Sequence, residues 1–582
     1  MKIELDFLPN KVIEHVKNQP NATAYTFVYN NKQGSKSISY AELDYKARLL
    51  AEIFHKKNLM QERLILLYPT GIEFIVAYLA CLYSGAIAIP LNCSNNDSPN
   101  KYIPLIVSIV KNANVRAIVT TDYLATIIQQ ASSTQIQKID IICTDLIYTK
   151  DKVNEFVPVS MLPTMLSHLQ YTSGSTSTPR GVICNHENLA NSLCETAKIW
   201  QYSSKSITVS WAPHSHVYGL IVGLLVPLYS GSQAIIMSAN DFLINPISWL
   251  NAISHFKATH SGCPNFGYEF CIEQIDDEEL KELNLATWQV ASNGGESVQL
   301  NTLIKFFNKF KAAGFKFESF YPAYGMSECT GLITTRPADS KFSPSYFSRK
   351  ELQYNHAVEV EQMPQTGKSN IKTQAFVSCG MPIHGLTIKI VNAKTEREVV
   401  SNHIGEVWLS GPTCTFGYWH TTDLPVGRFS DDMNVYIKTG DLGFIHKGEL
   451  FLVGRLKELI ILYGKNYYPT DIEMEVKNSN TYFVNNICAA FSALIGENEE
   501  LFIVQEIEDY FSEQEYLSAI SSARKTLSLK YSIDAYAIIL VPQHSIPKTA
   551  SGKLQRKMTS QRYFKKAFNI VYQSIKAPAS LL

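Results

Sequence analysis

Hydrophobic runs of strand length alternate with amphipathic stretches along the first half of the chain. Aliphatic and β-branched runs predict buried strands at RLILLY (63–68), VRAIVTT (115–121) and QAIIM (233–237). Apolar residues at helical spacing predict helices in AELDYKARLLAEIFHKK (41–57) and NPISWLNAISHFK (245–257). Because such alternation is typical of layered sheets and helices, we predict an α/β fold.

The most apolar stretch is FIVAYLACLYSGAIAIPL, from Phe74 to Leu91. Ser84, Gly85 and Pro90 interrupt it, so we interpret it as a buried helix, a turn and a strand rather than a membrane span. The N-terminal MKIELDFLPNK has no apolar segment of the kind found in secretion signals. We therefore expect a cytoplasmic protein with no membrane span.

The second half of the chain contains a long polar segment, and the predicted secondary structure changes after it. Residues 337–374 are unpatterned and unusually long for a connection, so this segment is either functional or disordered. GEVWLSG (405–411) and YIKTGDLGFI (436–445) then predict strands and turns, and the charged GRLKELI (454–460) precedes a mixed α/β tail. We place a domain boundary in that charged stretch. The predicted domains are a large N-terminal one, 1–456, and a small α+β one, 457–582.

Composition supports a folded, multidomain protein. The chain has 582 residues, more than one hydrophobic core usually serves, and it is 46% hydrophobic and 18% charged. Lys and Arg (52) balance Asp and Glu (52), so the basic excess of a nucleic-acid-binding protein is missing. The eleven cysteines contain no C-x-x-C pair, which favours reduced thiols in the cytoplasm.

One loop-like stretch has the composition of a phosphate site. LQYTSGSTSTPRG (169–181) follows a hydrophobic approach with Ser, Thr and Gly and then Arg180. Free backbone N–H groups, hydroxyls and a cation suit a polyphosphate. The pattern G-x-x-x-x-G-K-[ST] is absent, so a solvent-exposed flexible loop explains this stretch alone equally well.

Further stretches make a nucleotide site the better interpretation. In YPAYGMSE (321–328), Tyr324 can stack on a purine and Glu328 can offer a hard oxygen ligand to Mg²⁺. KTGDLG (438–443) places Asp441 in a turn suited to ribose hydroxyls, and GRLKELI supplies Arg455. PKTASGKLQRK (547–557) carries Lys553 in a glycine-containing loop. Each stretch alone is more simply a turn or a solvated charge, but their order along one chain argues against chance.

Together these stretches resemble the adenylate-forming superfamily, which includes acyl-CoA ligases, adenylation domains of peptide synthetases and luciferases. The resemblance runs from about residue 20 to about residue 560. Within that superfamily the chain is most similar to fatty acyl-AMP ligases, through LQYTSGST, WAPHSHVYGLI, SGCPNFGYEFC, SNGGES, YPAYGMSE and VSCGMPIHG. The segment 337–374 lies where those ligases carry an insertion that coenzyme A ligases lack.

The resemblance implies a role for each matching residue. The implied ATP and AMP contacts are Thr172, Ser173, Gly174, Ser175, Thr176 and Arg180 in the phosphate loop; Asn293, Gly294, Gly295 and Glu296 beside the adenine; Tyr324, Gly325 and Met326 around the stacking aromatic; and Asp441 and Arg455 at the ribose. It also implies Glu328 and Thr172 as ligands of Mg²⁺, Lys553 as the mobile catalytic lysine with Glu328 beside it, and Lys457 as the hinge. An acyl pocket is implied at His216, Val217, Gly219 and Pro264.

Two residues depart from the family pattern. Arg180 stands where the phosphate loop usually ends in Lys, which replaces a compact charge by a planar fork and puts ATP affinity or geometry in doubt. Val217 stands where related ligases usually have Asp, which makes the pocket mouth more apolar. We interpret His214 and His216 as parts of a pocket wall rather than as catalytic groups. The region offers no acidic residue for a substrate ammonium, so an α-amino acid is disfavoured.

Three functions compete at this point. The first is an ATP- and Mg²⁺-dependent fatty acyl-AMP ligase that activates a medium- or long-chain fatty acid, releases pyrophosphate and passes the acyl group to the phosphopantetheine thiol of an acyl carrier protein. The second is an acyl-CoA ligase with a decorated loop. The third is a non-catalytic homologue that binds acyl chains or nucleotide. For the first function we expect a monomer with no nucleic-acid partner.

Overall fold

The chain forms two compact units. The computed structural model describes residues 6–29, 34–93, 99–131, 136, 139–147, 156–172, 179–338, 340, 344–360, 372–421, 426–428, 433–484, 486–496, 498–508, 512–548 and 553–576. The first unit comprises Met1–Phe342, Cys379–Thr387 and Leu409–Ile437. The second unit comprises Ser343–Ser378, Ile388–Trp408 and Lys438–Leu582. Each unit is described by itself below.

The first unit alternates strands and helices along most of its length. Its helices are α1 (Leu8–Asn18), α2 (Tyr40–Lys56), α3 (Ile72–Ser84), α4 (Pro99–Ala113), α5 (Asp122–Ala131), α6 (His186–Ile199), the π-helix η2 (Gly219–Leu225), α7 (Val226–Tyr229), α8 (Ala239–Ile244), α9 (Ile247–Phe256), α10 (Asn265–Gln274), η3 (Glu279–Glu282), α11 (Leu300–Phe310), η4 (Lys311–Ala313), η5 (Phe317–Ser319) and η6 (Ser327–Cys329). Its strands are β1 (Thr23–Val28), β2 (Ser35–Ser39), β3 (Arg63–Tyr68), β4 (Ile87–Asn92), β5 (Ala117–Thr120), β6 (Asp140–Cys143), β7 (Leu166–Thr172), β8 (Arg180–Asn185), β9 (Ile207–Ser210), β10 (Gln233–Ile236), β11 (His260–Cys263), β12 (Val290–Gly294), β13 (Phe320–Met326), β14 (Gly331–Thr335), β17 (Met381–Pro382) and β20 (Val426–Gly427).

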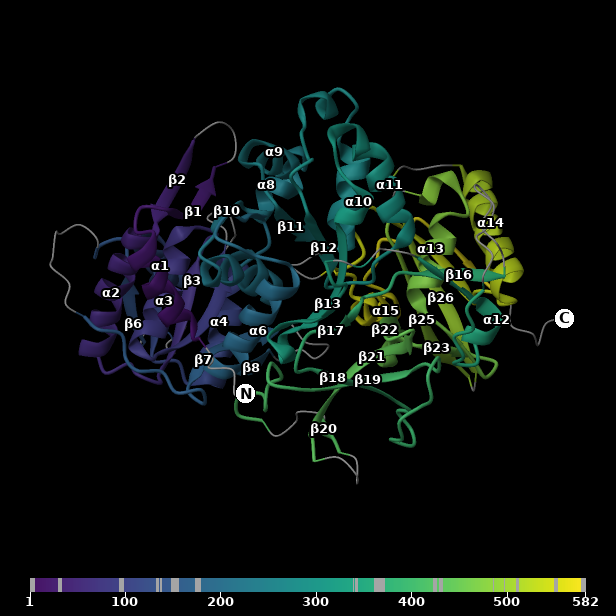
Figure 1. Cartoon of the computed structure of the whole chain (residues 1–582). Helices are drawn as coiled ribbons and strands as arrows, with labels where there is room; N and C mark the ends of the chain where they lie inside the picture. Colours follow the sequence, from purple (N-terminus) through teal and green to yellow (C-terminus); the bar gives the residue numbers. More distant parts are fainter. Residues whose placement is uncertain are drawn as a thin grey trace. The chain divides into compact units, whose positions relative to one another are not determined.

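Two large sheets organise this unit. One has nine strands in the order β17-β14-β13-β12-β11-β9-β10-β1-β2, and its strands from β13 to β1 run parallel. The other has six strands in the order β6-β5-β3-β4-β7-β8, parallel except for the last pair. Figure 1 shows α3 beside β3 of the second sheet. The α/β prediction is confirmed.

The hydrophobic pattern explains the layers. Along β3, Leu64 and Leu66 lie in one hydrophobic cluster with α2 and α3, whereas Ile65 and Leu67 lie in another with α4 and α5. Alternate strand residues point to opposite faces, so helices cover both sides of this sheet. The predicted helix, turn and strand after Phe74 is confirmed, because α3 ends at Gly85, whose φ of 72° is left-handed, and β4 follows.

The second unit contains the polar segment and the C-terminal tail. Its helices are α12 (Arg349–Leu352), η7 (Leu456–Glu458), α13 (Pro469–Lys477), η8 (Thr481–Phe483), α14 (Glu513–Tyr531) and α15 (Arg556–Phe564). Its strands are β15 (Ser345–Ser348), β16 (Thr373–Phe376), β22 (Glu449–Arg455), β23 (Ile460–Leu462), β24 (Lys465–Tyr467), β25 (Cys488–Ile495), β26 (Asn498–Ile507), β27 (Ala537–Pro542) and β28 (Tyr572–Ile575). Three further strands hold residues of both units: β18 (Thr387–Val391), β19 (Gly405–Ser410) and β21 (Tyr436–His446).

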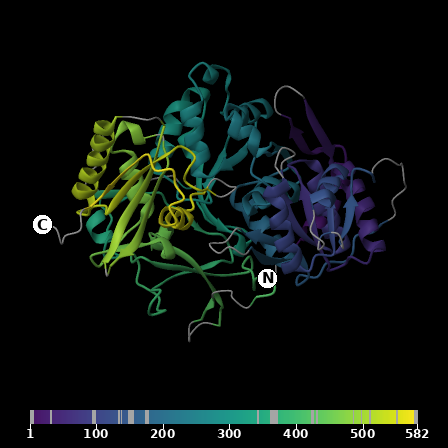
Figure 2. The ribbon, with the colours of Figure 1, turned by 180° about the vertical axis from the view of Figure 1, so that it is seen from behind.

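A four-stranded sheet forms the core of the second unit. Its order is β25-β26-β27-β28, and α14 lies along one side of it, as the view from behind shows (Figure 2). Leu501 and Ile503 of β26 pack toward α13 and α14, while Phe502 and Val504 lie in the cluster on the other face. The described part of the polar segment contains β15 and the start of β16, which pair antiparallel with Ser345 opposite Phe376.

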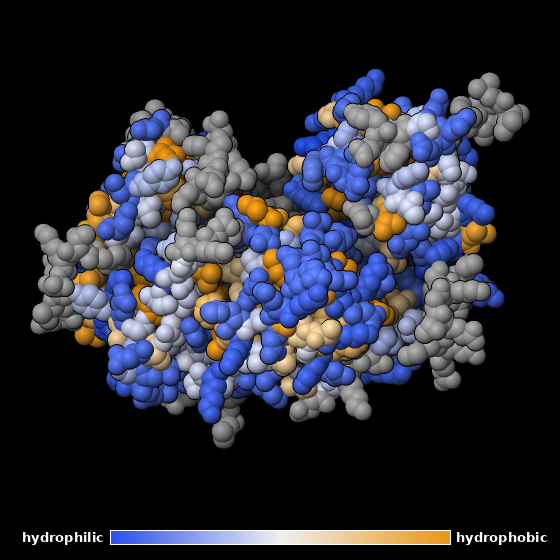
Figure 3. All heavy atoms as spheres, turned by 90° about the horizontal axis from the view of Figure 1, so that it is seen from above, coloured by the Kyte–Doolittle hydropathy of each residue, from blue (hydrophilic) through white to orange (hydrophobic). Residues whose placement is uncertain are grey.

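The face of the molecule seen in Figure 3 is largely polar. On the face seen in Figure 3, hydrophilic residues cover most of the described surface and hydrophobic residues occur in small groups. Scattered apolar side chains are normal on folded proteins. Among the described residues, no helix combines the length and the apolar character needed to cross a membrane.

Candidate active site

The predicted phosphate loop is framed by a hairpin of the first unit. β7 and β8 pair antiparallel, which sets Thr172, the last residue of β7, opposite Arg180, the first residue of β8. Ser173, Gly174, Ser175 and Thr176 lie outside the described residues. The hairpin therefore presents a hydroxyl and a cation at the two ends of the predicted loop.

Glu328 lies in a cluster with two residues from distant parts of the chain. It belongs to the short turn η6, which follows β13. The hydroxyl of Tyr418 donates a hydrogen bond of 2.7 Å to its Oε1 atom. The guanidinium of Arg180 lies 5.6 Å from the centroid of the Tyr418 ring. A carboxylate, a phenol and a cation thus meet at the end of the hairpin.

Burial and the neighbouring carboxylate keep the Tyr418 hydroxyl protonated. Burial, together with the neighbouring Glu328 carboxylate, raises the pKa of Tyr418, and Arg180 opposes that rise. Tyr418 therefore stays a neutral hydrogen-bond donor at physiological pH. A second hydrogen bond fixes the turn itself, because the amide of Thr415 donates to the carbonyl oxygen of Glu328 at 2.7 Å.

The segment predicted to border the adenine begins at the end of β12. Asn293 lies opposite Cys263 of β11 and Pro322 of β13, in parallel register. Its side chain donates to Asn265 at 3.3 Å, while its Oδ1 atom is buried and, within the described part of the chain, has no hydrogen-bond partner. Ligands of open α/β sheets bind at the carboxyl ends of parallel strands, and buried polar atoms are normally paired. Asn293 therefore has the position and the unused acceptor of a ligand contact.

The three residues after Asn293 form the turn that leaves β12. Gly294 approaches its neighbouring strand so closely that a Cβ atom would lie 2.5 Å from the carbonyl oxygen of Ala323. Gly295 has a φ of 84°, which favours glycine. Glu296 accepts a hydrogen bond of 2.6 Å from the amide of Phe266, at the start of α10. Its position beside the adenine remains a prediction.

Tyr324, Gly325 and Met326 end the adjacent strand β13. Tyr324 is 7% exposed, and its hydroxyl lies 3.8 Å from the sulfur of Met326. The register with β14 shifts between Tyr324 and Gly325, which marks an irregularity where the strand ends. All three residues therefore lie at the same edge of the sheet as Asn293, and the last of them, Met326, is two residues before Glu328.

The residues predicted to form the acyl pocket lie around the start of η2. His216 is half-buried and accepts a hydrogen bond of 3.2 Å from the amide of Tyr218 at its Nδ1 atom. Val217 is buried in the core, Gly219 begins η2, and Pro264 directly precedes α10. The neighbouring His214 stacks on Phe74 with 3.8 Å between ring centroids. Burial lowers the pKa of His214 to about 4, so it is a neutral structural residue.

A small cavity lies beside these residues. It has a volume of about 10 Å³, enough for about one water molecule, and lies among η2, β9, β11 and β12. Tyr218, Gly223, His260, Gly262 and Ser292 are among the residues that line it. The Tyr218 and Ser292 hydroxyls form a hydrogen bond of 2.6 Å across it. The cavity is too small for an alkyl chain, and it is not lined by the predicted acyl-pocket residues, so their role remains a prediction.

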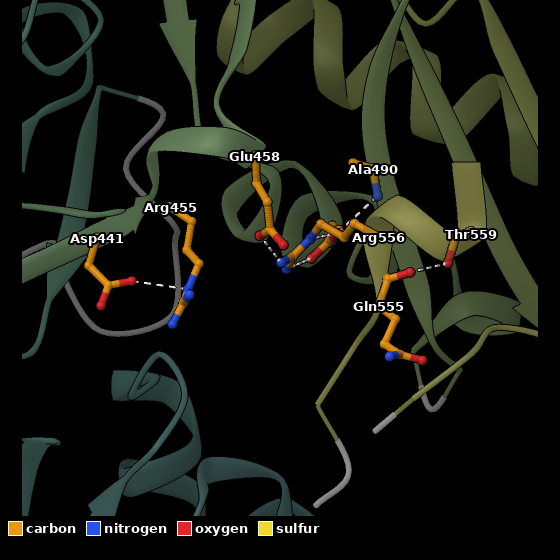
Figure 4. A network of polar contacts seen from close by, with 8 residues as sticks. Asp441, Arg455, Glu458, Ala490, Gln555, Arg556 and Thr559 are labelled. Atoms are coloured by element: carbon orange, nitrogen blue, oxygen red, sulfur yellow. Dashed lines mark hydrogen bonds and ion pairs between the residues drawn. The ribbon is translucent and has the colours of Figure 1, made fainter. Parts of the chain in front are cut away.

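In the second unit, Asp441 and Arg455 form one side of the predicted nucleotide site. They lie opposite each other on β21 and β22, and the Nε atom of Arg455 lies 3.0 Å from Oδ1 of Asp441 (Figure 4). Asp441 lies within β21 and not in the predicted turn, and the preceding Gly440, whose φ is 73°, donates its amide to Glu406 at 2.9 Å. The Asp441 side chain is 8% exposed and that of Arg455 is 61% exposed. A fixed carboxylate thus lies beside an accessible donor.

Lys553 lies on the returning limb of a loop that ends at α15. The neighbouring Leu554 forms a bridge with Lys548, and residues 549–552 lie outside the described part. Three residues later, Arg556 donates two hydrogen bonds to Glu473, at 2.7 and 2.8 Å, and one to Glu458 at 2.7 Å. Figure 4 shows Arg556 reaching toward Glu458 and Gln555 beside it. Lys457, the predicted hinge, is exposed and directly precedes Glu458 in η7.

The donor set of the first unit fits Mg²⁺. Among the described residues no three His, Cys, Asp or Glu side chains cluster as a protein cage for a metal. Mg²⁺ usually binds through one or two carboxylates together with water and substrate phosphates, so a cage is not required. Glu328 offers the carboxylate and Thr172 a hydroxyl oxygen.

The structure groups the predicted residues by unit. In the first unit, Arg180 meets Glu328 through Tyr418, and Asn293 lies near Tyr324 on neighbouring strands. In the second, Asp441 meets Arg455, and Arg556 links the Lys553 segment to the turn of Lys457. Sequence reasoning missed Tyr418, Tyr218 and Arg556. For Tyr418, a signal in the sequence was the Gly-Tyr-Trp run at 417–419, which follows Ser-Gly-Pro at 410–412.

Comparisons with known proteins identify the families that this chain resembles. The AMP-binding enzyme family matches residues 12–419, and the AMP domain of Disco-interacting protein 2-like proteins matches residues 457–573. The medium-chain-fatty-acid–[acyl-carrier-protein] ligase JamA of Moorena producens is 36% identical, with 92% of this chain and 91% of JamA aligned. The long-chain-fatty-acid–AMP ligase FadD26 of Mycobacterium marinum is 28% identical, with 97% of this chain and 98% of FadD26 aligned.

Solved structures extend the similarity to three dimensions. The fatty acyl-adenylate ligase from L. pneumophila, solved in complex with acyl adenylate and pyrophosphate, is 30% identical with a TM-score of 0.73 and covers 98% of both chains. A fatty acyl-adenylate ligase structure from a study of the E. coli and L. pneumophila enzymes has 26% identity and a TM-score of 0.83, covering 97% of this chain and 99% of that one. From the family match and these likenesses along nearly its whole length, we conclude that the chain belongs to the AMP-binding enzyme family.

Proposed function

We propose that this protein activates a medium- or long-chain fatty acid with ATP, forming acyl-AMP and pyrophosphate, and then passes the acyl group to the phosphopantetheine thiol of an acyl carrier protein. The names of JamA and FadD26 support the fatty acid and the adenylate, and the name of JamA supports the carrier protein. The observation that carries the proposal is the meeting of Glu328, Tyr418 and Arg180 at the end of the β7–β8 hairpin.

The chemistry requires positive charge between two anions. A fatty-acid carboxylate that approaches the α-phosphate of ATP meets a negatively charged group, so the site must neutralise both. Arg180 supplies a fixed cation beside the phosphate loop, and Tyr418 holds the Glu328 carboxylate in one orientation. Mg²⁺ held by Glu328 and Thr172 would screen the phosphate charge.

The second unit supplies the remaining groups in this proposal. Asp441 accepts the ribose hydroxyls, and Arg455, already oriented by Asp441, donates to the sugar or phosphate. Lys553 places its ammonium between the α-phosphate and the acyl carboxylate. Asn293 and Tyr324 hold the adenine, and the alkyl chain lies against the predicted acyl-pocket residues around His216 and Val217.

The second half-reaction requires Lys553 to leave and a thiol to enter. We propose that the turn containing Lys457 is the hinge for this movement, because a few residues at a junction can absorb the change in backbone angles. The large domain of the proposal is 1–456 and the small one is 457–582. The eleven cysteines, all within the described residues, are free thiols, which supports a cytoplasmic location.

Contacts of the polar segment favour a carrier protein over coenzyme A. Arg349 of α12 donates to Glu475 of α13 at 2.8 Å and to the hydroxyl of Tyr531 of α14 at 2.6 Å. Its Nε atom donates to the carbonyl of Thr373 at 3.0 Å, and Lys530 also pairs with Glu475. This largely buried arginine fastens the segment 337–374 to the small domain. In this proposal, the attachment hinders the rearrangement of the small domain that transfer to coenzyme A requires.

The direct test is a product analysis of the purified full-length protein. ATP, Mg²⁺ and a mixed fatty-acid pool are supplied with either coenzyme A or a phosphopantetheinylated carrier protein. We expect acyl-AMP alone in the absence of a thiol, and acyl-carrier protein when the carrier is added. Strong acyl-CoA formation would instead identify an acyl-CoA ligase. Nucleotide binding without acyl-AMP would identify a non-catalytic homologue.

Replacing Arg349 tests how the thiol is selected. Arg349→Met keeps most of the side-chain volume but removes the link to Glu475, which retains Lys530 as a partner. We expect about tenfold more acyl-CoA, because the small domain is released, while acyl-AMP formation without thiol changes little. This expected change corresponds to about 1.4 kcal/mol.

The matched control for Arg349 is its neighbour Lys350, an exposed residue of the same helix. Lys350→Met should leave the ratio of acyl-CoA to acyl-carrier protein at the wild-type value. An Arg349→Met protein with intact acyl-AMP formation and an unchanged product ratio would contradict the role of the segment.

A further inference from the structure

Two segments of the first unit run beside each other at the turn that carries Glu328. The amide of Thr415 donates to the carbonyl of Glu328 at 2.7 Å, and the hydroxyl of Thr330 donates to the carbonyl of Thr413 at 2.9 Å. Between these two hydrogen bonds, Cys329 faces Cys414 with 3.1 Å between the sulfur atoms. The two thiols are neighbours because a hydrogen bond on each side of the pair joins the two segments.

Other hydrogen bonds hold both segments in place. The side chain of Asn188 donates to the carbonyls of Pro412 at 2.8 Å and Cys414 at 3.1 Å. The hydroxyl of Ser192 donates to the carbonyl of Thr330 at 2.6 Å. Both anchoring residues lie on α6, so one helix fixes the two segments. The sulfur atoms thus stay close without any covalent bond between them.

The two cysteines differ in access. Cys414 is half-buried, whereas Cys329 is 0% exposed. A small oxidant in solution can therefore reach Cys414 first, and Cys329 is then positioned to react with it. Within the described residues, the pair belongs to no cluster of three metal-ligating side chains, which leaves disulfide chemistry as the use that two facing thiols support.

We propose that Cys414 and Cys329 are a peroxide-sensitive modification site that forms a reversible disulfide. Cys414 sulfur attacks hydrogen peroxide, the O–O bond breaks, and the products are a sulfenic acid on Cys414 and one water molecule. Cys329 sulfur then attacks the Cys414 sulfur, the S–O bond breaks, and the departing oxygen takes the thiol proton and leaves as water. The two thiols are oxidised, the peroxide is reduced, and an external thiol reverses the reaction by exchange.

The disulfide would act on the adjacent Glu328. A disulfide bond is about 2.05 Å long, so the sulfur atoms must approach by about 1 Å. Glu328 directly precedes Cys329, and Tyr418 follows Cys414 by four residues, so both partners of the 2.7 Å hydrogen bond are displaced. A displacement of about 1 Å at a reacting centre costs up to about 10²-fold in rate. We expect oxidation to slow acyl-AMP formation at least tenfold. This activity effect rests on the proposed function.

The experiment uses the full-length reduced protein with and without hydrogen peroxide. After free thiols are blocked, digestion without reductant and mass spectrometry should reveal a peptide pair joined through Cys329 and Cys414. Dithiothreitol should remove the joined pair and restore the rate of acyl-AMP formation. In Cys414→Ser, peroxide should leave the rate unchanged. Cys143→Ser, which removes another half-buried thiol, should respond to peroxide as the wild type does.

The outcomes separate this inference from the proposed function. Absence of the joined pair, or equal peroxide inhibition of wild type and Cys414→Ser, overturns the inference. A fully joined protein with an undiminished rate overturns its effect on Glu328. If the reduced wild-type protein forms no acyl-AMP, the proposed function fails, and the joined peptide still decides whether the disulfide exists.

Discussion

Lys553→Ala is expected to reduce acyl-AMP formation by about 10²- to 10³-fold, the usual cost of removing one group that stabilises transition-state charge. The lysine ammonium lies between two anions in the proposed mechanism, and alanine leaves their repulsion uncompensated. Alanine removes only the half-buried Lys553 side chain and keeps Arg556 with its bonds to Glu473 and Glu458, so the substitution should leave the fold intact. Single-turnover measurement of acyl-AMP and a thermal melt test both expectations.

The control for Lys553 is another lysine of the same stretch. Lys557 is exposed on α15. Lys557→Ala removes the same charge and should keep a near-normal rate. Near-normal acyl-AMP production by Lys553→Ala would refute its assigned role. Transfer of a preformed acyl adenylate to the carrier protein should survive the substitution, since that step takes place with Lys553 withdrawn.

Glu328→Gln is expected to lower acyl-AMP formation by about 10²-fold and to raise the Mg²⁺ concentration needed for half-maximal rate. Glutamine keeps an oxygen that accepts the hydrogen bond from Tyr418, so the turn retains its support. What is lost is the negative charge that binds the metal. A Mg²⁺ titration of the rate at saturating ATP measures the effect.

Tyr418→Phe tests the hydrogen bond to Glu328 separately from the charge of the carboxylate. It removes the 2.7 Å hydrogen bond but leaves the charge of Glu328 and the ring beside Arg180. We expect a loss below tenfold with little change in Mg²⁺ requirement. If Glu328→Gln and Tyr418→Phe behave alike, Glu328 acts as a structural acceptor and not as the metal ligand.

Local sequence pattern predicted much of the fold. The runs at 63–68 and 233–237 correspond to β3 and β10, and the stretch 41–57 to α2. Those elements follow from hydrophobic periodicity and short-range turn signals, which act within a few residues. The order of motifs also pointed to the family to which the chain belongs. The assigned roles of the site residues remain predictions.

Side-chain partners that are distant in sequence were beyond such reasoning. Tyr418 meets Glu328 across 90 residues, and Arg556 meets Glu473 across 83. No periodicity encodes a hydrogen bond of this kind, because the packing of strands decides which side chains face each other. The segment 337–374 shows a related difficulty: it is polar and unpatterned, yet Arg349 anchors it through charge rather than through apolar burial.

The hydrogen bonds of Arg556 to Glu458 and Glu473 connect the segment that carries Lys553 to the turn that contains Lys457. We expect these ion pairs to keep the stretch from Glu458 to α15 together when the small domain of the proposed mechanism rotates. The hinge of that mechanism then lies before Glu458, as proposed for Lys457. A small rotation at the proposed hinge would then move Lys553 over a larger distance, and the C-terminal segment would not have to unfold.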